Sequence, residues 1–424
     1  MTHAVVIGAS IAGLTAAQAL SSRFDEVTIL DRDSLPSDHS ARRGVPQGKH
    51  LHILLAAGQR ALDELFPGLV NDMTAAGAVP FDPGVDLGVH RYGGLWPRQE
   101  LGIDLMSFSR PLLEAVLRQR LSANVTIKDN TAVGGLLGGK HGVTGVRTDA
   151  EHIDADLVVD ASGRGSRSDR WLEELGFPAP EVAEVKINVG YASQFLHRDA
   201  FLPEGKGMFV LPTPPGEKRS GALLPVDGDR WLLTVGGWHG DFPRTDAEFR
   251  TFAHSLPYKG IGAMLSSQQP VSGVAFSTFP SSRRRYFEKL KELPNGYVAM
   301  GDAVCSFNPI YGQGMTAASL EAVALGQLLD RGPLNPREFY QRVSNILKAP
   351  WRFAVGGDFN FPETTGPKPA GISLLNGYAA RIQRAAQSDY EVRRVFSYVQ
   401  HLMLPPSALF RPSIVAKTLF KKSS

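Results

Sequence analysis

Runs of apolar residues at the start of the chain predict a strand–turn–helix–strand unit. Residues 3–8 form a short apolar run typical of a buried strand, and residues 11–21 carry apolar side chains at helical spacing. A second apolar run, residues 27–30, predicts another buried strand that ends at Asp31. The first 33 residues are therefore expected to form one folded unit around two buried strands.

The apolar pattern further along the chain predicts a mixture of helices and strands. Helices are expected at residues 52–65, 110–121 and 314–329, and strands at residues 125–128, 143–147, 157–159 and 298–300. Residues 34–50 are polar and rich in Ser, Arg and Gly, which predicts a loop. Residues 79–97 lack a helical period and predict short strands or a flap.

The pattern changes between residues 185 and 238, where short alternating runs are separated by Gly and Pro. This alternation predicts an antiparallel sheet, a layer that can form the wall of a substrate cavity. Residues 356–373 are dense in Gly and Pro and predict a loop or lid. The last 50 residues have a mainly helical pattern, and we expect their basic end to dock on the protein's own surface.

Composition narrows the class of protein. The chain has 424 residues, 43% of them apolar and 21% charged, and a net charge of +3, which gives no reason to expect nucleic acid as a partner. The single Cys305 excludes an internal disulfide framework and predicts a cytoplasmic location. The first apolar run is broken by Gly8, Ser10 and Gly13, so we expect neither a signal peptide nor stable membrane insertion.

The first chemistry-bearing motif is Gly8-Ala9-Ser10-Ile11-Ala12-Gly13, placed between the first strand and its helix. Gly8 provides the sharp turn, Gly13 allows close packing of helix and strand, and the helix start can face a pyrophosphate. Asp31 and Arg32 follow about 20 residues later, at the strand end where a ribose hydroxyl would bind. We interpret this unit as a dinucleotide-binding site, although Ser10 replaces the usual middle glycine.

Two further segments place acidic and small residues at strand ends. Asp160 follows the strand at 157–159 and leads into a Ser- and Gly-rich stretch up to Arg167. Gly301 and Asp302 follow the strand at 298–300 and lead through Pro309 into a glycine-containing helix start at residues 312–315. Asp302 is suited to accept hydrogen bonds from polyol hydroxyls, and the glycines would let the backbone approach a flat ring.

These three motifs, in this order, resemble the class A flavoprotein monooxygenases, the family that includes para-hydroxybenzoate hydroxylase and, more distantly, squalene epoxidase. The resemblance covers residues 1–60, 105–175 and 295–330. Within that family, the stretch from Arg43 to Gln47 with His50 and His52 is similar to bacterial enzymes of secondary metabolism, including polyether epoxidases.

The resemblance implies an FAD cofactor and a set of residues that bind it. The implied cofactor-binding residues are Gly8, Ser10, Ile11, Ala12, Gly13, Asp31, Arg32, Arg43, Arg110, Asp160, Gly301, Asp302, Gly312, Gln313, Gly314 and Met315. Pro309, Gly312 and Gly314 are the implied catalytic positions, because their loop would lie against the isoalloxazine ring, where backbone donors can stabilise negative charge. No metal ligand is expected: histidines two residues apart, as His50 and His52 are, favour a flavin-loop or surface role.

The implied fold is α/β, with a Rossmann-type FAD-binding domain of the GR2-like kind interleaved with an antiparallel-sheet substrate domain. The expected FAD-binding domain is discontinuous and comprises residues 1–80, 100–180 and 290–340. The expected substrate domain comprises residues 81–99 and 181–289, and residues 341–424 form a helical C-terminal region.

The implied activity is insertion of one oxygen atom from O2 into a largely apolar aromatic, polyketide or isoprenoid compound of secondary metabolism, such as an antibiotic. Reduced flavin would react with O2 to give a C4a-hydroperoxide, which hydroxylates or epoxidises the substrate. NAD(P)H is the expected electron donor, but Ala161 replaces the glycine of the family's Asp-Gly motif, so a separate flavin reductase stays an alternative. A flavin-dependent reductase of the geranylgeranyl reductase type and a non-catalytic flavin-binding protein are the competing interpretations.

Three other features invite a functional interpretation. Cys305 is expected to be a packing residue, and the residues 283–285, all Arg, a solvated charged turn. Five aromatic residues suit a pocket for an apolar ligand as a group: Tyr92, Trp96, Phe209, Trp231 and Trp238.

Overall fold

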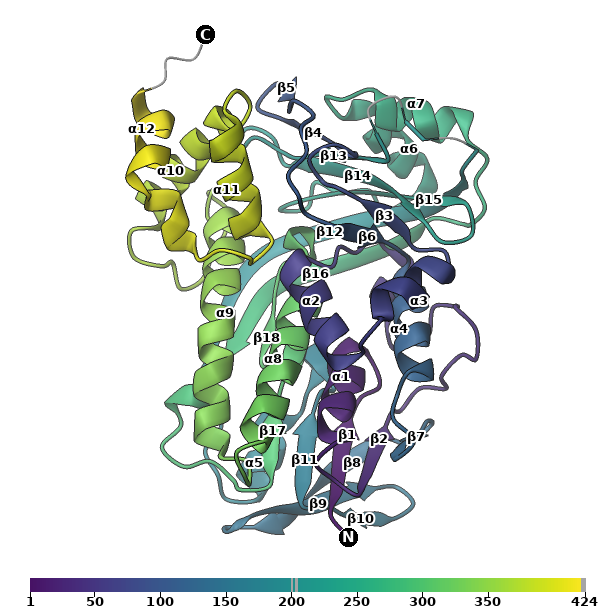
Figure 1. Cartoon of the computed structure of the whole chain (residues 1–424), viewed down its shortest axis with the longest axis vertical. Helices are drawn as coiled ribbons and strands as arrows, with labels where there is room; N and C mark the ends of the chain where they lie inside the picture. The colour runs from purple at the N-terminus through teal and green to yellow at the C-terminus, as the bar shows by residue number, and fades with distance from the viewer. Residues whose placement is uncertain (200, 203–204, 421–424) are drawn as a thin grey trace.

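The computed structural model describes residues 1–199, 201–202 and 205–420. Its lower half contains a five-stranded parallel sheet (Figure 1). The strands lie in the order β17 (Tyr297–Ala299), β11 (Leu157–Asp160), β1 (His3–Ile7), β2 (Glu26–Leu30) and β7 (Val125–Lys128). Three stretches that are far apart in the sequence thus contribute to one sheet. Its strands are covered on both faces, which explains why their sequences are near-continuous apolar runs.

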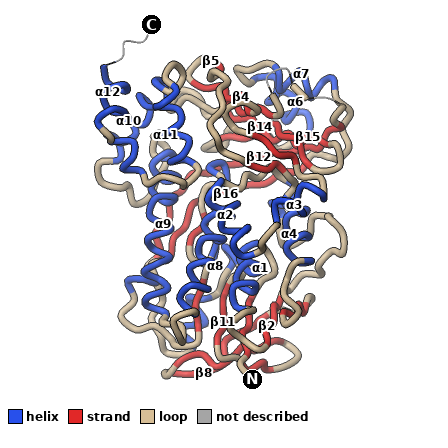
Figure 2. The backbone as a smooth tube through the Cα atoms, in the orientation of Figure 1, coloured by secondary structure: helices blue, strands red, loops and turns tan. Residues whose placement is uncertain are grey.

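Helices pack around this sheet and against each other (Figure 2). They are α1 (Ile11–Leu20), α2 (Ala56–Leu65), α3 (Leu69–Ala75), α4 (Arg110–Gln119), α5 (Ser168–Glu174), α8 (Gly314–Leu329) and α9 (Pro336–Asp358). The contact between α1 and α8 brings together the two helices that follow the first and third sequence motifs. Both helices are rich in Ala and Gly, which lets their axes approach closely.

A second sheet of eight strands lies mainly in the upper half (Figure 1). Its order is β18 (Cys305–Ser306), β16 (Ala275–Arg285), β12 (Val182–His197), β15 (Arg230–Gly237), β14 (Arg219–Val226), β13 (Gly207–Val210), β4 (Leu87–Arg91) and β5 (Gly94–Leu95). Neighbouring strands are antiparallel except the parallel pair β13 and β4. Helices α6 (Asp246–Ser255) and α7 (Gly260–Ser267) pack against it around the fully buried Trp231.

Smaller elements complete the described chain. Two small sheets contain β8 (Val133–Gly139), β9 (Gly142–Thr148) and β10 (His152–Asp154), and β3 (Val79–Phe81) with β6 (Leu105–Ser107). Short 3-10 turns span Pro46–Lys49, Gly163–Gly165, Phe287–Lys289, Gly301–Ala303, Pro309–Tyr311 and Pro406–Phe410.

The C-terminal helices α10 (Ile372–Ala385), α11 (Tyr390–Gln400) and α12 (Pro412–Phe420) form a separate apolar cluster beside the eight-stranded sheet (Figure 1). Ile414 of α12 is fully buried there, which confirms that the C-terminal segment docks on the protein itself; Lys421 and Lys422 lie outside the described residues. None of the described helices has both the length and the apolar character needed to span a membrane.

The α/β fold class with an antiparallel layer and C-terminal helices is confirmed, but several local predictions need correction. Helix α2 begins at Ala56 rather than residue 52, and α3 and β8 were not predicted. The predicted loop at 356–373 is shorter, because α9 continues to Asp358.

The three arginines at residues 283–285 are not a solvated turn but the end of strand β16. Arg284 and Arg285 are buried and form ion pairs with Glu288 and Asp169. Sequence alone suggested solvent exposure because the charged run carries no sign of the partners that make burial tolerable.

Candidate functional site

One large cavity of about 1720 Å³ joins the two sheets and the C-terminal helices. Its lining includes the turn between β1 and α1, the loop at 307–315 and side chains of β4, α9, α10 and α11. This volume exceeds the roughly 300–1,000 Å³ of a typical small-molecule site. The cavity therefore has room for a large cofactor and a second ligand.

The glycine turn at one end of the cavity has the geometry that the first motif requires. Gly8 has a φ of +103°, and a Cβ there would lie 2.6 Å from the backbone oxygen of Ala161. A Cβ on Gly13 would lie 1.7 Å from the backbone oxygen of Gly8, so only glycine lets α1 pack on this turn. Ile11 and Ala12 line the cavity at the start of α1. No side chain caps this helix start, so its backbone N–H groups are available to an anion.

A buried network of charges surrounds Asp31. One carboxylate oxygen of Asp31 accepts hydrogen bonds from the backbone N–H of Ala9, at 2.6 Å, and from Arg42, at 3.1 Å. The same Arg42 pairs with Asp33 at 3.1 Å and with Glu114 at 3.4 Å. Arg42 lines the cavity, whereas the predicted Arg43 is exposed and lies outside the lining. Which of the two adjacent arginines faces the cavity depends on the path of the chain into the 3-10 turn at Pro46–Lys49, and the sequence pattern does not predict that path.

Ser10 and Arg110 are joined in this network although they are 100 residues apart. The Ser10 hydroxyl donates to Glu114 at 2.6 Å and accepts from Arg110 at 2.7 Å. Arg110 also pairs with Glu114 at 3.0 Å and donates to His52 Nε2 at 3.3 Å. Ser10, where the usual motif has glycine, therefore connects the glycine turn to the start of α4 through its hydroxyl.

The histidines at 50 and 52 are both held in the neutral state by burial. Burial and the nearby Lys49 lower the pKa of His50 to about 4, and its Nδ1 lies 2.7 Å from the Ser193 hydroxyl. Burial and the Arg110 charge lower the pKa of His52 to about 3, while His52 Nδ1 donates to the backbone oxygen of His50. Within the described ranges, no group of three His, Cys, Asp or Glu residues could hold a metal ion.

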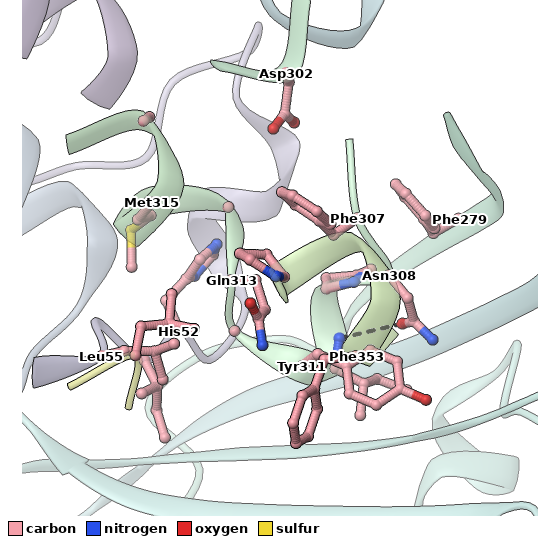
Figure 3. A pocket seen from close by; sticks show the side chains of 18 of the residues that line it. His52, Leu55, Phe279, Asp302, Phe307, Asn308, Tyr311, Gln313, Met315 and Phe353 are labelled. Atoms are coloured by element: carbon pink, nitrogen blue, oxygen red, sulfur yellow. Dashed lines mark hydrogen bonds between the residues drawn. The ribbon is translucent and has the colours of Figure 1, made fainter. Parts of the chain in front are cut away.

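Asp302 lies at the N-terminal side of the 307–315 loop, and its carboxylate points into the space that Phe307 and Met315 border (Figure 3). Burial raises the pKa of Asp302, whereas the charges of Arg110 and Arg164 lower it. The preceding Gly301 has a φ of +62° and donates its N–H to buried Glu321 at 2.6 Å. Gly301 itself lies behind the cavity lining and sets the direction in which Asp302 leaves the strand.

The loop that leads into α8 presents backbone and one unpaired side-chain oxygen to the cavity. Pro309, Gly312, Gln313, Gly314 and Met315 all belong to the lining. Gly312 has a φ of +65°, and no side chain caps the start of α8. The buried Oε1 of Gln313 has no hydrogen-bond partner among the described residues. A buried oxygen without a donor is costly, so this atom is suited to a ligand.

The structure places Asp160 away from the cavity. Its fully buried carboxylate accepts hydrogen bonds from Ser162, Ser166 and Ser168 at distances of 2.5–2.9 Å. It therefore organises the turn after β11, and Arg164 in that turn reaches the cavity. Arg164 was not among the predicted site residues. Its Nη1 donates to the backbone oxygen of Ser281 at 2.6 Å.

The far end of the cavity is mainly apolar. Trp96, Phe209 and Trp238 of the five predicted aromatic residues belong to its lining, together with Phe353 and Phe396. Tyr92 and Trp231 do not line it, and Trp231 instead forms the core under α6 and α7. Sequence could not separate these cases, because alternate positions of a strand face opposite sides of the sheet. Cys305 is a buried packing residue as expected.

Comparison with known proteins identifies the chain's relatives. The model of the "FAD binding domain" family matches residues 1–331. Protein Rv3254 of Mycobacterium tuberculosis is 37% identical, and the match covers 96% of this chain and 91% of that protein. Kynurenine 3-monooxygenase of Salinispora arenicola is 28% identical, with 78% of this chain and 72% of that protein covered.

Solved structures share the fold at low sequence identity. A flavoprotein/dehydrogenase from Cytophaga hutchinsonii has a TM-score of 0.71 at 15% identity, covering 98% of this chain and 96% of that one. PqsL from Pseudomonas aeruginosa, described as a probable FAD-dependent monooxygenase, has a TM-score of 0.58 at 17% identity, covering 94% and 99%. With the family match over most of its length and the convergence of its three motifs on one cavity, this chain belongs to the class A flavoprotein monooxygenase family.

Proposed function

We propose that this protein is an FAD-dependent monooxygenase that inserts one oxygen atom from O2 into a largely apolar secondary metabolite, by hydroxylation or epoxidation. The observation that supports the proposal most strongly is one continuous cavity, which extends from two uncapped helix starts to an aromatic chamber. Electrons would come from NAD(P)H or from a separate flavin reductase. Because the chain has one glycine-turn unit of this kind, NAD(P)H would bind only transiently at the surface.

The residues in the cavity fit FAD. The start of α1, with Ile11 and Ala12, would receive the pyrophosphate, and Asp302 would accept hydrogen bonds from the polyol chain. The unpaired oxygen of Gln313 and the backbone at Gly312 are suited to polar groups on the edge of a flat ring. When bound and reduced, FAD supplies the activation of O2.

The protein itself would contribute a dry and shaped space for the substrate. Trp96, Phe209, Phe353 and Phe396 make the chamber apolar, and these residues would exclude water, which otherwise promotes loss of the activated oxygen before it reaches the substrate. The chamber walls also hold a substrate against the 309–315 loop, so the reacting atoms are positioned before oxygen transfer. An aromatic, polyketide or isoprenoid skeleton matches these walls better than a charged metabolite does.

A substrate-coupled oxygen assay tests the proposal. Purified FAD-loaded protein, NAD(P)H and a panel of apolar aromatic, polyketide and isoprenoid compounds are monitored for O2 uptake, and products are analysed by mass spectrometry under ¹⁸O2. We expect at least one compound to gain one ¹⁸O atom, with no turnover under argon. Product formation under argon, with a saturated double bond and no ¹⁸O, would instead identify the geranylgeranyl reductase type of activity.

A further inference from the structure

The described residues include a buried carboxyl group below the 307–315 loop that lies outside the cavity lining, that of Asp358 at the end of α9. Its Oδ1 accepts three hydrogen bonds, from Trp238 Nε1 at 3.0 Å, from Asn308 Nδ2 at 2.8 Å and from the Tyr311 hydroxyl at 3.2 Å. Its Oδ2 is buried and has no partner among the described residues. One oxygen atom of α9 therefore joins the loop to Trp238, the residue that follows β15 of the eight-stranded sheet.

The two loop residues in this cluster have few alternative positions. Asn308 is fully buried, and its side-chain oxygen accepts from the N–H of Ile310 at 3.2 Å, so both ends of its amide are used. Tyr311 lies directly on the backbone of α9, since a Cβ on Gly357 would be 2.2 Å from the Tyr311 hydroxyl. Figure 3 shows Asn308 and Tyr311 on the same loop as Gln313, beside Phe353 of α9.

We propose that Asp358 is a positioning residue for the flavin: its ionised carboxylate holds Asn308 and Tyr311, and through them the 309–315 backbone, in the conformation that binds the cofactor. The inference rests on the proposed function only in taking this loop as the flavin-facing one. A hydrogen bond to a charged acceptor is roughly twice as strong as one to a neutral acceptor. Loss of the charge would therefore loosen the loop while leaving the three donors in place.

The charge of Asp358 changes near neutral pH. Burial raises its pKa to about 7 against the opposing effect of the three hydrogen bonds. Of the titratable groups nearby, burial raises the pKa of Tyr311, and burial lowers that of His239, which is linked to Asp358 through Thr364. Arg91 acts on Tyr311 as a constant positive charge. We therefore expect the loop to be held more firmly above pH 7 than below it.

The test measures FAD dissociation constants by fluorescence titration of the full-length apoprotein at pH 6, 7 and 8. Asp358→Asn keeps the shape and one acceptor oxygen but cannot ionise. The ratio of its dissociation constant to that of the wild type should be close to one at pH 6 and rise several-fold by pH 8, with a limit of about tenfold per pH unit for one proton. Because other groups, including Asp302, affect both proteins equally, the ratio isolates Asp358.

Two further variants make the result specific. Glu363→Gln changes an exposed carboxylate in the adjoining loop and should keep the ratio at one at every pH. Tyr311→Phe removes one of the three donors, should raise the dissociation constant less than Asp358→Asn at pH 8, and is the fallback if the Asn variant does not fold.

A ratio for Asp358→Asn that is constant from pH 6 to 8, or a Tyr311→Phe protein that binds FAD as tightly as the wild type at pH 8, would overturn the proposal. Failure of the oxygen assay with the expected FAD ratios would contradict only the proposed function.

Discussion

At the residue scale, the site depends on carboxyl groups placed in different surroundings. Asp31 is tied into ion pairs, Asp302 faces the cavity, and Glu321 and Asp358 are buried without a nearby cation as hydrogen-bond partner. Burial raises the pKa of Glu321 to about 8, because an isolated charge in an apolar environment is costly. Carboxyl groups therefore have three different roles in this protein, and their surroundings distinguish these roles.

Replacement of Asp302 by Ala tests the cofactor site at this scale. The variant would lose the hydrogen bonds that the Asp302 carboxylate accepts from cofactor hydroxyls. A hydrogen bond to a charged group contributes about 1.5–3 kcal/mol. We expect FAD binding to weaken by roughly 10- to 100-fold while the fold is retained. Flavin content of the purified protein and a fluorescence titration measure this, and full flavin occupancy in the variant would count against the assignment of Asp302.

At the element scale, glycines inside helices mark places where another segment approaches. Gly13 in α1 faces the Gly8 turn, and Gly357 in α9 faces Tyr311. The predicted loop at 356–373 begins with Gly356 and Gly357, because glycine is a poor helix former, but both residues lie in α9, where Gly357 lets the Tyr311 ring approach the helix. The contact with Tyr311, which lies 46 residues before Gly357 in the chain, explains why glycine stands in this helix, and local helix propensity does not.

A pair of glycine-to-alanine changes separates propensity from packing. Gly377 lies in α10 with open space around its Cβ position, so Ala there should stabilise the protein by up to about 1 kcal/mol. Gly13→Ala gains the same propensity but places a Cβ 1.7 Å from a backbone oxygen, and we expect a net loss of roughly 3 kcal/mol or more. Urea unfolding of both variants measures the difference; a stabilised Gly13→Ala protein would show that the turn can move freely.

At the scale of the whole molecule, buried titratable groups lie where the layers meet. His50 and His52 lie where the Rossmann-type unit meets the eight-stranded sheet, and His401 follows α11 beside α2. Burial lowers the pKa of His401 to about 4, as it lowers those of the other two. Assembly of the layers thus fixes the protonation states of groups on both sides of each interface.

Stability should pass through a maximum near pH 6.5. Glu321 and Asp358 have folded-state pKa values above those of the unfolded chain, so their contribution to stability is lost as the pH rises through about 7–8. The three histidines have folded-state pKa values below about 6.5, so they favour unfolding as the pH falls below that value. Each group contributes a slope of at most about 1.4 kcal/mol per pH unit, and below pH 6 three histidines outweigh two carboxyl groups.

Denaturant unfolding from pH 5 to 8.5 measures this profile. Glu321→Gln should flatten the decline above pH 7, because the amide keeps an acceptor for Gly301 and does not ionise. Stability that rises steadily up to pH 8.5 in the wild type would show that these buried groups do not control the profile.

The sequence by itself determined the parts of this protein that depend on local pattern. The apolar runs located all five strands of the parallel sheet, the glycine spacing located the turn before α1, and the run at 314–329 gave the bounds of α8. These features are readable because period and turn chemistry are properties of neighbouring residues. The resemblance of these motifs to a known family implied the FAD-binding family and the α/β fold, and both are confirmed.

Only the tertiary structure decided which side chains meet. In the folded protein Arg42 rather than Arg43 lines the cavity, and Asp160 lies outside the lining. Two of the three arginines at 283–285 are buried, and Asp358 lies beneath the 307–315 loop. Arg285 pairs with Asp169 and Asp358 binds Asn308 across more than 40 residues of sequence, and the choice of Arg42 depends on one residue of register at a turn. Such contacts form only when the layers pack together, and pairing and burial there decide the charge and role of each group.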